Sequence, residues 1–188
     1  MAHSTAEREK AMKAVEAIFE RYHLITSSSS STTPLFDAHV MSNLKLISAT
    51  QSGTVDYDFH LDERYANING VMHGGAAGVI FDMCTTTALG PLARKGFWDF
   101  LGGVTRTLNI SYLKAIPMGT TIRIHSEVTQ IGKTMAMIRG AMMSQDGKII
   151  YCTCEHHKVA VPTKEKHLEH RVEWDELWEK DGMVGAKL

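Results

Sequence analysis

Residues 67–75 read NINGVMHGG and lead directly into the run AAGVIFDMCTTTALGPL at residues 76–92. Drawn as a helix, this run is apolar on nearly every side, and Asp82 is its only charged residue. A helix without a polar face must be surrounded by protein. A carboxylate on such a helix is unfavourable unless it has partners and a task. The run therefore predicts a buried central helix that carries one functional acid.

Both ends of this helix are marked in the sequence. Gly74 and Gly75 stand at its start, and Gly90-Pro91 marks where it can stop. A membrane span is a poor alternative, because the run contains Asp82 and the polar triplet at residues 85–87 and lacks flanking anchors.

Strand patterns lie on both sides of the helix. Val55, Tyr57 and Phe59 alternate with polar residues, which is typical of a half-buried strand. Asp146-Gly147 is a strong hairpin signal. We expect strands at residues 44–50, 54–61, 103–115, 120–130, 133–144 and 148–161, with the last four forming an antiparallel meander joined by tight turns. Two strands, one helix and four strands predict an α+β fold, with a curved sheet wrapped around the helix.

The terminal regions look like additions to this unit. Apolar residues recur at helical spacing over residues 5–24, and a Ser-rich linker follows at residues 27–34. A short helix is expected at residues 173–180. The predicted organisation is an N-terminal helix and linker (1–35), a central domain (36–162) and a C-terminal helix with a tail (163–188).

Composition excludes several classes of function. The chain has 188 residues and a net charge of -1, without a Lys/Arg stripe for nucleic acid. Its three cysteines, Cys84, Cys152 and Cys154, have no metal or disulfide spacing, which favours reduced thiols inside a cell. We see no signal peptide.

The ending Ala186-Lys187-Leu188 is close to the Ser-Lys-Leu peroxisomal address. Peroxisomal and cytoplasmic locations both stay open, with the import receptor as a candidate partner.

The pattern resembles the hotdog fold and, within it, the small acyl-CoA thioesterases of the phenylacetate-pathway (PaaI-like) branch. The similarity covers roughly residues 40–161. Its motif residues are Asn67, Gly70, His73-Gly74-Gly75 and Asp82, followed by Gly103-Val104-Thr105, Asn109-Ile110-Ser111-Tyr112, Gly132-Lys133-Thr134, His156 and Lys158. The loop at residues 94–100 is longer than usual, and both terminal extensions fall outside the common core. These departures bear on substrate choice more than on chemistry.

The Gly pair and Asp82 suit thioester hydrolysis. Unpaired amides of Gly74 and Gly75 at the positive end of a helix can form an oxyanion hole, although glycines there can also serve close packing alone. Asp82 lies about 12 Å further along the helix. One carbonyl therefore cannot meet both groups of a single chain without bridging that gap, which favours a site shared between two chains. The resemblance implies such a homodimer, and a tetramer of two dimers.

Roles follow for the remaining candidates. Asp82 would act as general base or as a nucleophile. Asn67 would position water or the thioester, and His73 would orient the loop. The resemblance gives Thr105 a hydroxyl that helps to hold the attacking water. For Asn67, His73 and Thr105 a purely structural role is also open.

Substrate contacts are less specific. Arg106, Lys133 and Lys158 are candidates for the phosphates of coenzyme A, and Trp98 for the acyl end, while surface charge and packing are the alternatives. The neighbouring His156 and His157 point to opposite faces of a strand and make a poor metal site.

The sequence thus predicts an acyl-CoA thioesterase without a metal or redox cofactor, which releases a free acid and coenzyme A. The alternatives are an enoyl-CoA hydratase or dehydratase on the same fold, and a non-catalytic acyl-CoA-binding module.

Overall fold

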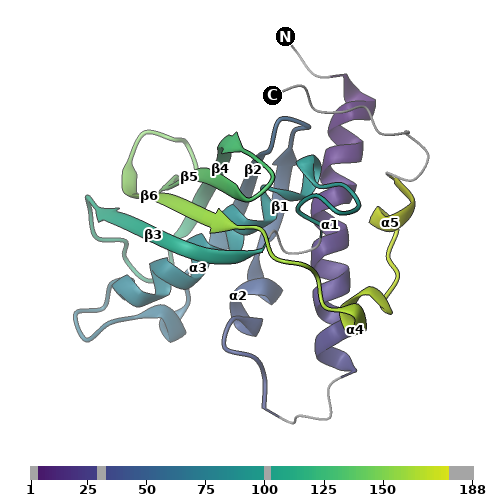
Figure 1. Cartoon of the computed structure of the whole chain (residues 1–188). Coiled ribbons are helices and arrows are strands. Elements are labelled where there is room, and N and C mark those ends of the chain that lie inside the picture. Colours follow the sequence, from purple (N-terminus) through teal and green to yellow (C-terminus); the bar gives the residue numbers. More distant parts are fainter. Residues whose placement is uncertain (1–3, 29–32, 100–102, 178–188) are drawn as a thin grey trace.

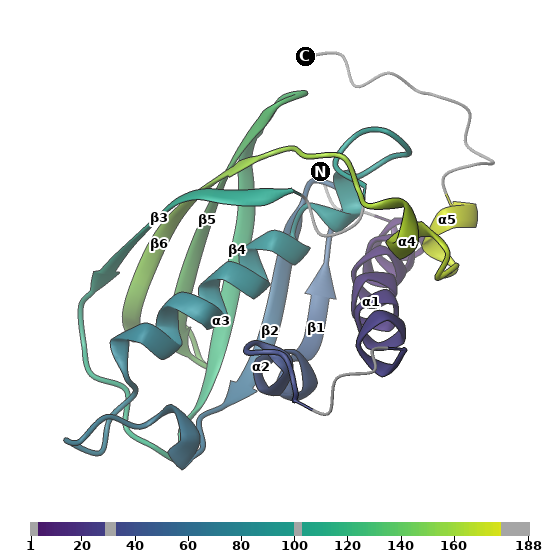
Figure 2. The same cartoon turned by 60° about the horizontal axis from the view of Figure 1, so that its bottom comes forward.

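A computed structural model describes residues 4–28, 33–99 and 103–177. Six strands form one antiparallel sheet in the order β1-β2-β4-β5-β6-β3. The strands are β1 (Lys45–Ala49), β2 (Thr54–His60), β3 (Val104–Tyr112), β4 (Thr121–Ile131), β5 (Met135–Ser144) and β6 (Ile150–Val159). The sheet curves around helix α3 (Gly74–Thr87), which lies across one face (Figure 2). The predicted α+β hotdog architecture is confirmed.

The expected four-strand meander is wrong in one place. β3 pairs with β6 at the edge of the sheet, and β4 pairs with β2 instead of β3. The turn before β4 explains the difference, because Met72 N–H donates to Ile116 O (2.9 Å) and Gly119 N–H donates to Leu61 O (2.8 Å). These bonds hold the turn beside the end of β2. The chain therefore crosses from one edge to the middle of the sheet rather than folding back.

The core lies between α3 and the sheet. Val55, Tyr57 and Phe59 are buried on one face of β2, as the alternation predicts. Gly140 on β5 lets the helix approach closely, since an added Cβ there would lie 3.0 Å from the ring of Phe81. The buried apolar residues of α3 are Ala77, Ile80, Phe81, Met83 and Cys84.

Burial of α3 is incomplete in the single chain, which corrects the expectation of a fully buried helix. The Asp82 side chain is 41% exposed, and Gly75 is exposed. The sheet covers only one side of the helix, so the opposite side remains open. The helix also begins at Gly74, and a short 3-10 turn, η2 (Gly90–Leu92), follows it.

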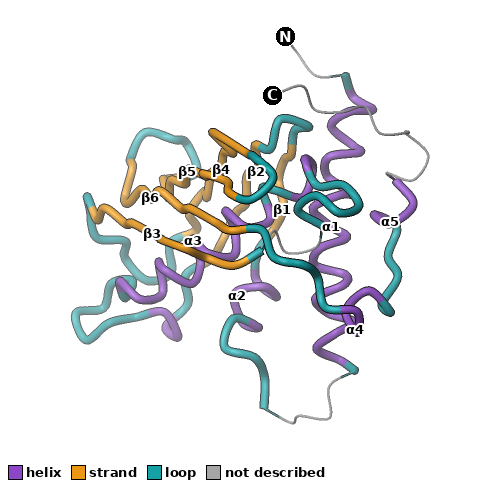
Figure 3. Tube along the Cα trace, viewed as in Figure 1, coloured by secondary structure: helices purple, strands orange, loops and turns teal. Residues whose placement is uncertain are grey.

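Helices outside the sheet occupy the side next to β1 (Figure 1). Helix α1 (Thr5–Ser27) begins at a capping box formed by Ser4 and Glu7. Two short C-terminal helices, α4 (Glu165–Leu168) and α5 (Trp174–Leu177), complete this side. Figure 3 separates these helices from the strands by colour. Within the described ranges, no helix is long and apolar enough to cross a membrane.

A buried ion pair attaches the C-terminal segment to α1. The Arg21 guanidinium is 2% exposed, contacts both carboxylate oxygens of Asp175 at 2.5 Å and donates to His170 O (3.0 Å). The short helix α5 covers part of the expected range 173–180, whose end lies outside the described residues. Ala186-Lys187-Leu188 also lies outside them, so peroxisomal import stays a prediction.

Two short elements near the site were not predicted. Helix α2 (Ala38–Asn43) lies between the linker and β1, and the 3-10 turn η1 (Glu63–Tyr65) follows β2. Six residues without a side-chain N-cap bond leave little periodic signal in the sequence for α2. Its position matters for the site, because α2 packs beside α3 (Figure 2).

Candidate active site

The start of α3 is organised around one peptide unit, the bond between Gly74 and Gly75. Gly75 N–H donates to Nδ1 of His73 (2.9 Å), which caps the helix. The Tyr112 hydroxyl donates to the carbonyl of Gly74 (2.7 Å). The N–H and the C=O of this peptide unit therefore both have hydrogen-bond partners within the chain. In the described part of the chain no hydrogen bond uses Gly74 N–H, so this amide is the open donor at the positive end of the helix.

The loop before α3 is shaped by Asn67. Its side-chain oxygen accepts from the amides of Asn69 (2.8 Å) and Val71 (3.4 Å). Gly70 closes the turn at φ +71°, a backbone conformation that favours glycine. The oxygen of the Asn67 side chain thus holds the loop, and its NH₂ group has no hydrogen-bond partner among the described residues.

Asp82 lies further along α3, where β3 and β6 reach the helix. The Thr105 hydroxyl of β3 donates to Asp82 Oδ1 (2.7 Å) and lies 3.0 Å from Nε2 of His156. Nε2 of His156 is 3.5 Å from the same carboxylate oxygen. A carboxylate, a hydroxyl and an imidazole from three elements therefore form one cluster.

His156 is neutral in this cluster. Burial is the main cause that lowers its pKa to about 4, and the positive charge of Lys158 lowers it further, while Asp82 opposes both. Nδ1 lies 2.6 Å from the Thr85 hydroxyl. We assign the proton to Nε2, because the Thr105 hydroxyl donates its own proton to Asp82 and its oxygen can accept one from Nε2. His156 is thus suited to orient Thr105 rather than to supply a proton.

Lys158 is placed differently from the prediction. Its side chain is 2% exposed, and Nζ donates to the Thr86 hydroxyl (2.8 Å). Burial lowers its pKa to about 8, and Asp82 acts in the opposite direction. A buried ammonium beneath α3 does not fit contact with a nucleotide phosphate at the surface. Arg106 on β3 and Lys133 in the β4–β5 turn are exposed and remain candidates for that contact.

Trp98, predicted to contact the acyl group, is instead buried and hydrogen-bonded within the protein. It is 4% exposed, and its indole N–H donates to the carbonyl of Gly132 (2.6 Å). Trp98 lines neither of the cavities described next, so these contacts fit packing of the long loop better than contact with an acyl group.

Two cavities meet along α3. The smaller, about 510 Å³, is lined by Asp82, Thr105 and Leu108. The larger, about 1030 Å³, lies at the start of the helix and includes His73 and Gly75 in its wall. Both cavities share three lining residues, Leu35, Phe36 and Val79. Among the described residues, no three His, Cys, Asp or Glu side chains gather as a metal site.

The structure therefore brings the predicted residues together as two groups. Asn67, His73, Gly74 and Gly75 lie at the start of α3, while Asp82 and Thr105 lie about two turns further on. Eight helical residues correspond to a rise of about 12 Å. One chain alone does not place the Asp82 carboxylate beside the open amide of Gly74.

Sequence reasoning named Tyr112 and His156 as motif residues without these roles, and it missed the role of Thr85. For His156 a signal was present, because Cys152, Cys154, His156 and Lys158 alternate along β6 and share its buried face. For Tyr112 and Thr85 only the tertiary contacts show the role.

Comparisons with known proteins agree with the fold. The family profile "Thioesterase superfamily" matches residues 69–151. Human acyl-coenzyme A thioesterase 13 is 31% identical over 97 residues, which are 52% of this chain and 65% of that protein. The match thus spans less than two thirds of this relative's length.

Solved structures share the fold. Thioesterase superfamily member 2 from zebrafish superposes with a TM-score of 0.61 at 25% identity, over 77% of this chain and 94% of that one. A thioesterase protein from Streptococcus pneumoniae, solved with coenzyme A, has a TM-score of 0.58 at 22% identity, over 69% of this chain and 94% of its own.

Proposed function

We propose that this chain, which has the hotdog fold, is a member of the thioesterase superfamily and hydrolyses acyl-CoA to a free acid and coenzyme A. The observation that carries the proposal is the partly exposed Asp82 carboxylate, held by Thr105 at the wall of a cavity. A relative named as an acyl-coenzyme A thioesterase and a related structure solved with coenzyme A support this class of substrate.

The Gly74 amide would bind the thioester oxygen. Its N–H is open, whereas His73 occupies the N–H of Gly75, so we assign the oxyanion contact to Gly74 and a supporting role to Gly75. The free NH₂ group of Asn67 is a second donor on the adjacent loop. One such donor contributes about 3 kcal/mol to transition-state stabilisation.

Asp82 would activate the attacking water. The carboxylate accepts a proton from water while the water oxygen bonds to the carbonyl carbon. Collapse of the tetrahedral intermediate then breaks the C–S bond, and the leaving thiolate takes up the proton from Asp82. Thr105, oriented by neutral His156, would hold the carboxylate and the water. Direct attack by Asp82 through an anhydride is the alternative course, and single turnover in ¹⁸O-water separates the two.

The complete site would need two chains. The separation of about 12 Å between Gly74 and Asp82 along one helix supports a homodimer in which each chain supplies one group. β3 is a sheet edge with exposed Val104 and Tyr112, and α3 has an open side. An unpaired strand edge invites pairing with a second chain. A tetramer of two such dimers follows from the family resemblance.

Arg106 and Lys133 would contact the coenzyme A phosphates, and the reaction requires no further cofactor.

A second candidate, hydration of an enoyl-CoA, is favoured by one observation: His156 Nε2 lies 3.5 Å from Asp82 Oδ1. A hydratase would use such a pair as acid and base. The lowered pKa of His156, about 4, argues against its service as an acid at neutral pH.

The test compares the wild type with Asp82→Asn on two substrates. Thiol release from acyl-CoA is expected for the wild type, with a loss of about 10²–10⁴-fold in kcat for the variant. Hydration of crotonyl-CoA is expected to stay at background. Hydration without thiol release would favour the hydratase, and ligand binding without either reaction would favour a binding module. Thermal unfolding serves as the folding control.

A further inference from the structure

We propose that the larger cavity binds the acyl group of the substrate, and that this group is an extended, unsubstituted hydrocarbon chain. The inference rests on the proposed function and adds the class of acyl group to it. The cavity of about 1030 Å³ lies between α1, α2 and the start of α3. Its size is at the upper end of the range of about 300–1,000 Å³ for small-molecule pockets.

The walls of this cavity are mainly apolar and come from three helices. α1 contributes Phe19, α2 contributes Val40 and Met41, and α3 contributes Ala76 and Val79. Apolar walls favour burial of the methylene groups of an acyl chain. The small side chain of Ala76 and the absent one of Gly75 leave room along the helix for such a chain.

The larger cavity includes Gly75 and shares Val79 with the smaller cavity, which Asp82 lines. Gly75 in its wall directly follows Gly74, the proposed oxyanion donor. Val79 belongs to both cavities and lies three residues before Asp82, on the same side of the helix. An acyl chain that extends from a carbonyl near either group therefore has a path into this space.

Two polar side chains of the wall, Tyr22 and His39, are paired with protein groups, while Arg64 and His73 are exposed lining residues. The Tyr22 hydroxyl donates to Asp37 Oδ1 (2.6 Å). Burial and this contact raise the pKa of Tyr22 above its usual range, so the hydroxyl remains a donor. Nδ1 of His39 is hydrogen-bonded to the Tyr65 hydroxyl. Because these two polar groups are paired and the helical walls are mainly apolar, we assign a plain hydrocarbon chain.

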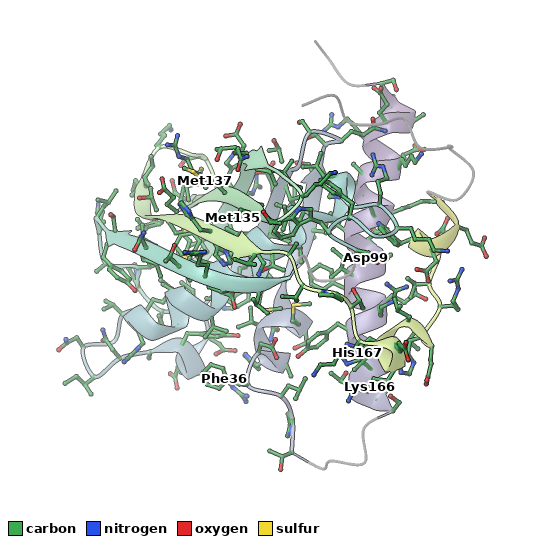
Figure 4. The ribbon with its side chains drawn as sticks, viewed as in Figure 1. Phe36, Asp99, Met135, Met137, Lys166 and His167 are labelled. Atoms are coloured by element: carbon green, nitrogen blue, oxygen red, sulfur yellow. The ribbon has the colours of Figure 1, made fainter. Side chains whose placement is uncertain are left out.

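Phe36 stands at the junction of the two cavities. Its side chain is 89% exposed and projects from the segment before α2 (Figure 4). α1, α2 and this segment all precede residue 69, where the family match begins. Chain-length preference is thus expected to be a property of the N-terminal region, separate from the catalytic machinery.

The test introduces a bulky side chain into the cavity from α2 and compares the hydrolysis of a long and a short acyl-CoA. Ala38→Phe adds a phenyl ring to its wall, and Ala6→Phe makes the same change at an exposed position of α1 outside the cavity. We expect Ala38→Phe to lower kcat/KM for dodecanoyl-CoA about tenfold or more and to change acetyl-CoA hydrolysis less than twofold. Ala6→Phe is expected to change neither. Equal effects of Ala38→Phe on both substrates would overturn the proposal.

Binding gives a second readout that does not depend on hydrolysis. Calorimetry with S-dodecyl-CoA and S-ethyl-CoA thioethers is expected to show tighter binding of the dodecyl compound to the wild type. Phe36→Ala, a surface change that leaves the core intact, is expected to weaken that binding about threefold and to leave the ethyl compound unaffected. Equal affinity of the wild type for both thioethers would refute the acyl cavity. Selective dodecyl binding without any turnover would instead refute the proposed hydrolysis alone.

Discussion

The two halves of the candidate site are built in opposite ways. The start of α3 uses backbone amides and carbonyls, and most of its parts come from residues 67–75. The acid half uses side chains, and its parts come from Asp82, Thr105 and His156 on three different elements. A backbone donor needs only a defined local conformation, whereas a side-chain cluster needs the whole sheet to be in place. The two halves therefore differ in how they can be recognised and in how they can be disrupted.

The strongest test asks whether the two halves act across two chains. Asp82→Asn and Gly74→Ala would be co-expressed with different tags, after each is shown to be impaired alone. In a mixed dimer, one site combines an intact Gly74 with an intact Asp82. We expect random mixing to restore about a quarter of wild-type activity, because half of the dimers are mixed and each has one intact site. Absence of rescue in purified mixed dimers would contradict a shared site.

Gly74→Ala tests the backbone half by itself. An added Cβ would lie 3.3 Å from the Tyr112 hydroxyl, so the contact that holds the Gly74 carbonyl must shift. We expect kcat to fall about 10- to 100-fold, since a misplaced oxyanion donor loses part of its contribution of about 3 kcal/mol.

Gly78→Ala is the matched control on the same helix. Its Cβ would meet only Ile110 Cδ1, at 3.8 Å. This change is expected to raise stability by up to about 1 kcal/mol in urea unfolding and to lower kcat less than Gly74→Ala does. A larger kcat loss at position 78 would argue against a special role for the Gly74 peptide.

The smallest expected effect concerns pH and tests the side-chain half. Burial lowers the pKa of His156 from its usual 6.5 to about 4, so the unfolded chain binds more protons than the folded one between these values. The stabilising effect of neutral His156 is present above pH 6.5 and is lost as the pH falls toward 4. His156→Gln is expected to flatten this dependence in urea unfolding measured from pH 4 to pH 7.

His125 provides a control of opposite sign. Its hydrogen bond with Asp56 raises its pKa, so its stabilising effect is present at low pH and is lost as the pH rises through the raised pKa. His125→Gln is therefore expected to steepen the loss of stability on the acid side. The same change of slope in both variants would contradict the assignment of a neutral, buried His156.

Much of the fold can be predicted from local patterns. The alternation of Val55, Tyr57 and Phe59 placed β2 within one residue of its observed end, and the Asp146-Gly147 signal marked the turn between β5 and β6. The pairing of β3 could not be predicted in this way. It depends on contacts of the turn before β4 with Leu61 and Met72, which are far away in the sequence.

The candidate site, like the fold, has some features that local patterns predict and others that depend on contacts between distant segments. The sequence predicts the His73-Gly74-Gly75 motif and Asp82 as site residues. It also makes Lys158 a candidate for phosphate contact, because local pattern does not reveal that its side chain is buried beneath α3. The partner of Asp82 required the register that brings β3 and β6 side by side.

The amino-acid sequence by itself determined the central helix, its glycine start, its single acid and the positions of the strands. Those features depend on spacing, turn residues and apolar periodicity over a few residues. The tertiary structure decided which strand lies at the edge, that Asp82 stays partly exposed and that Lys158 and His156 are buried beside it. It also decided that a large cavity opens between α1, α2 and the start of α3. These features arise from contacts between distant segments, whose burial and electrostatic effects exist only once the sheet has closed around the helix.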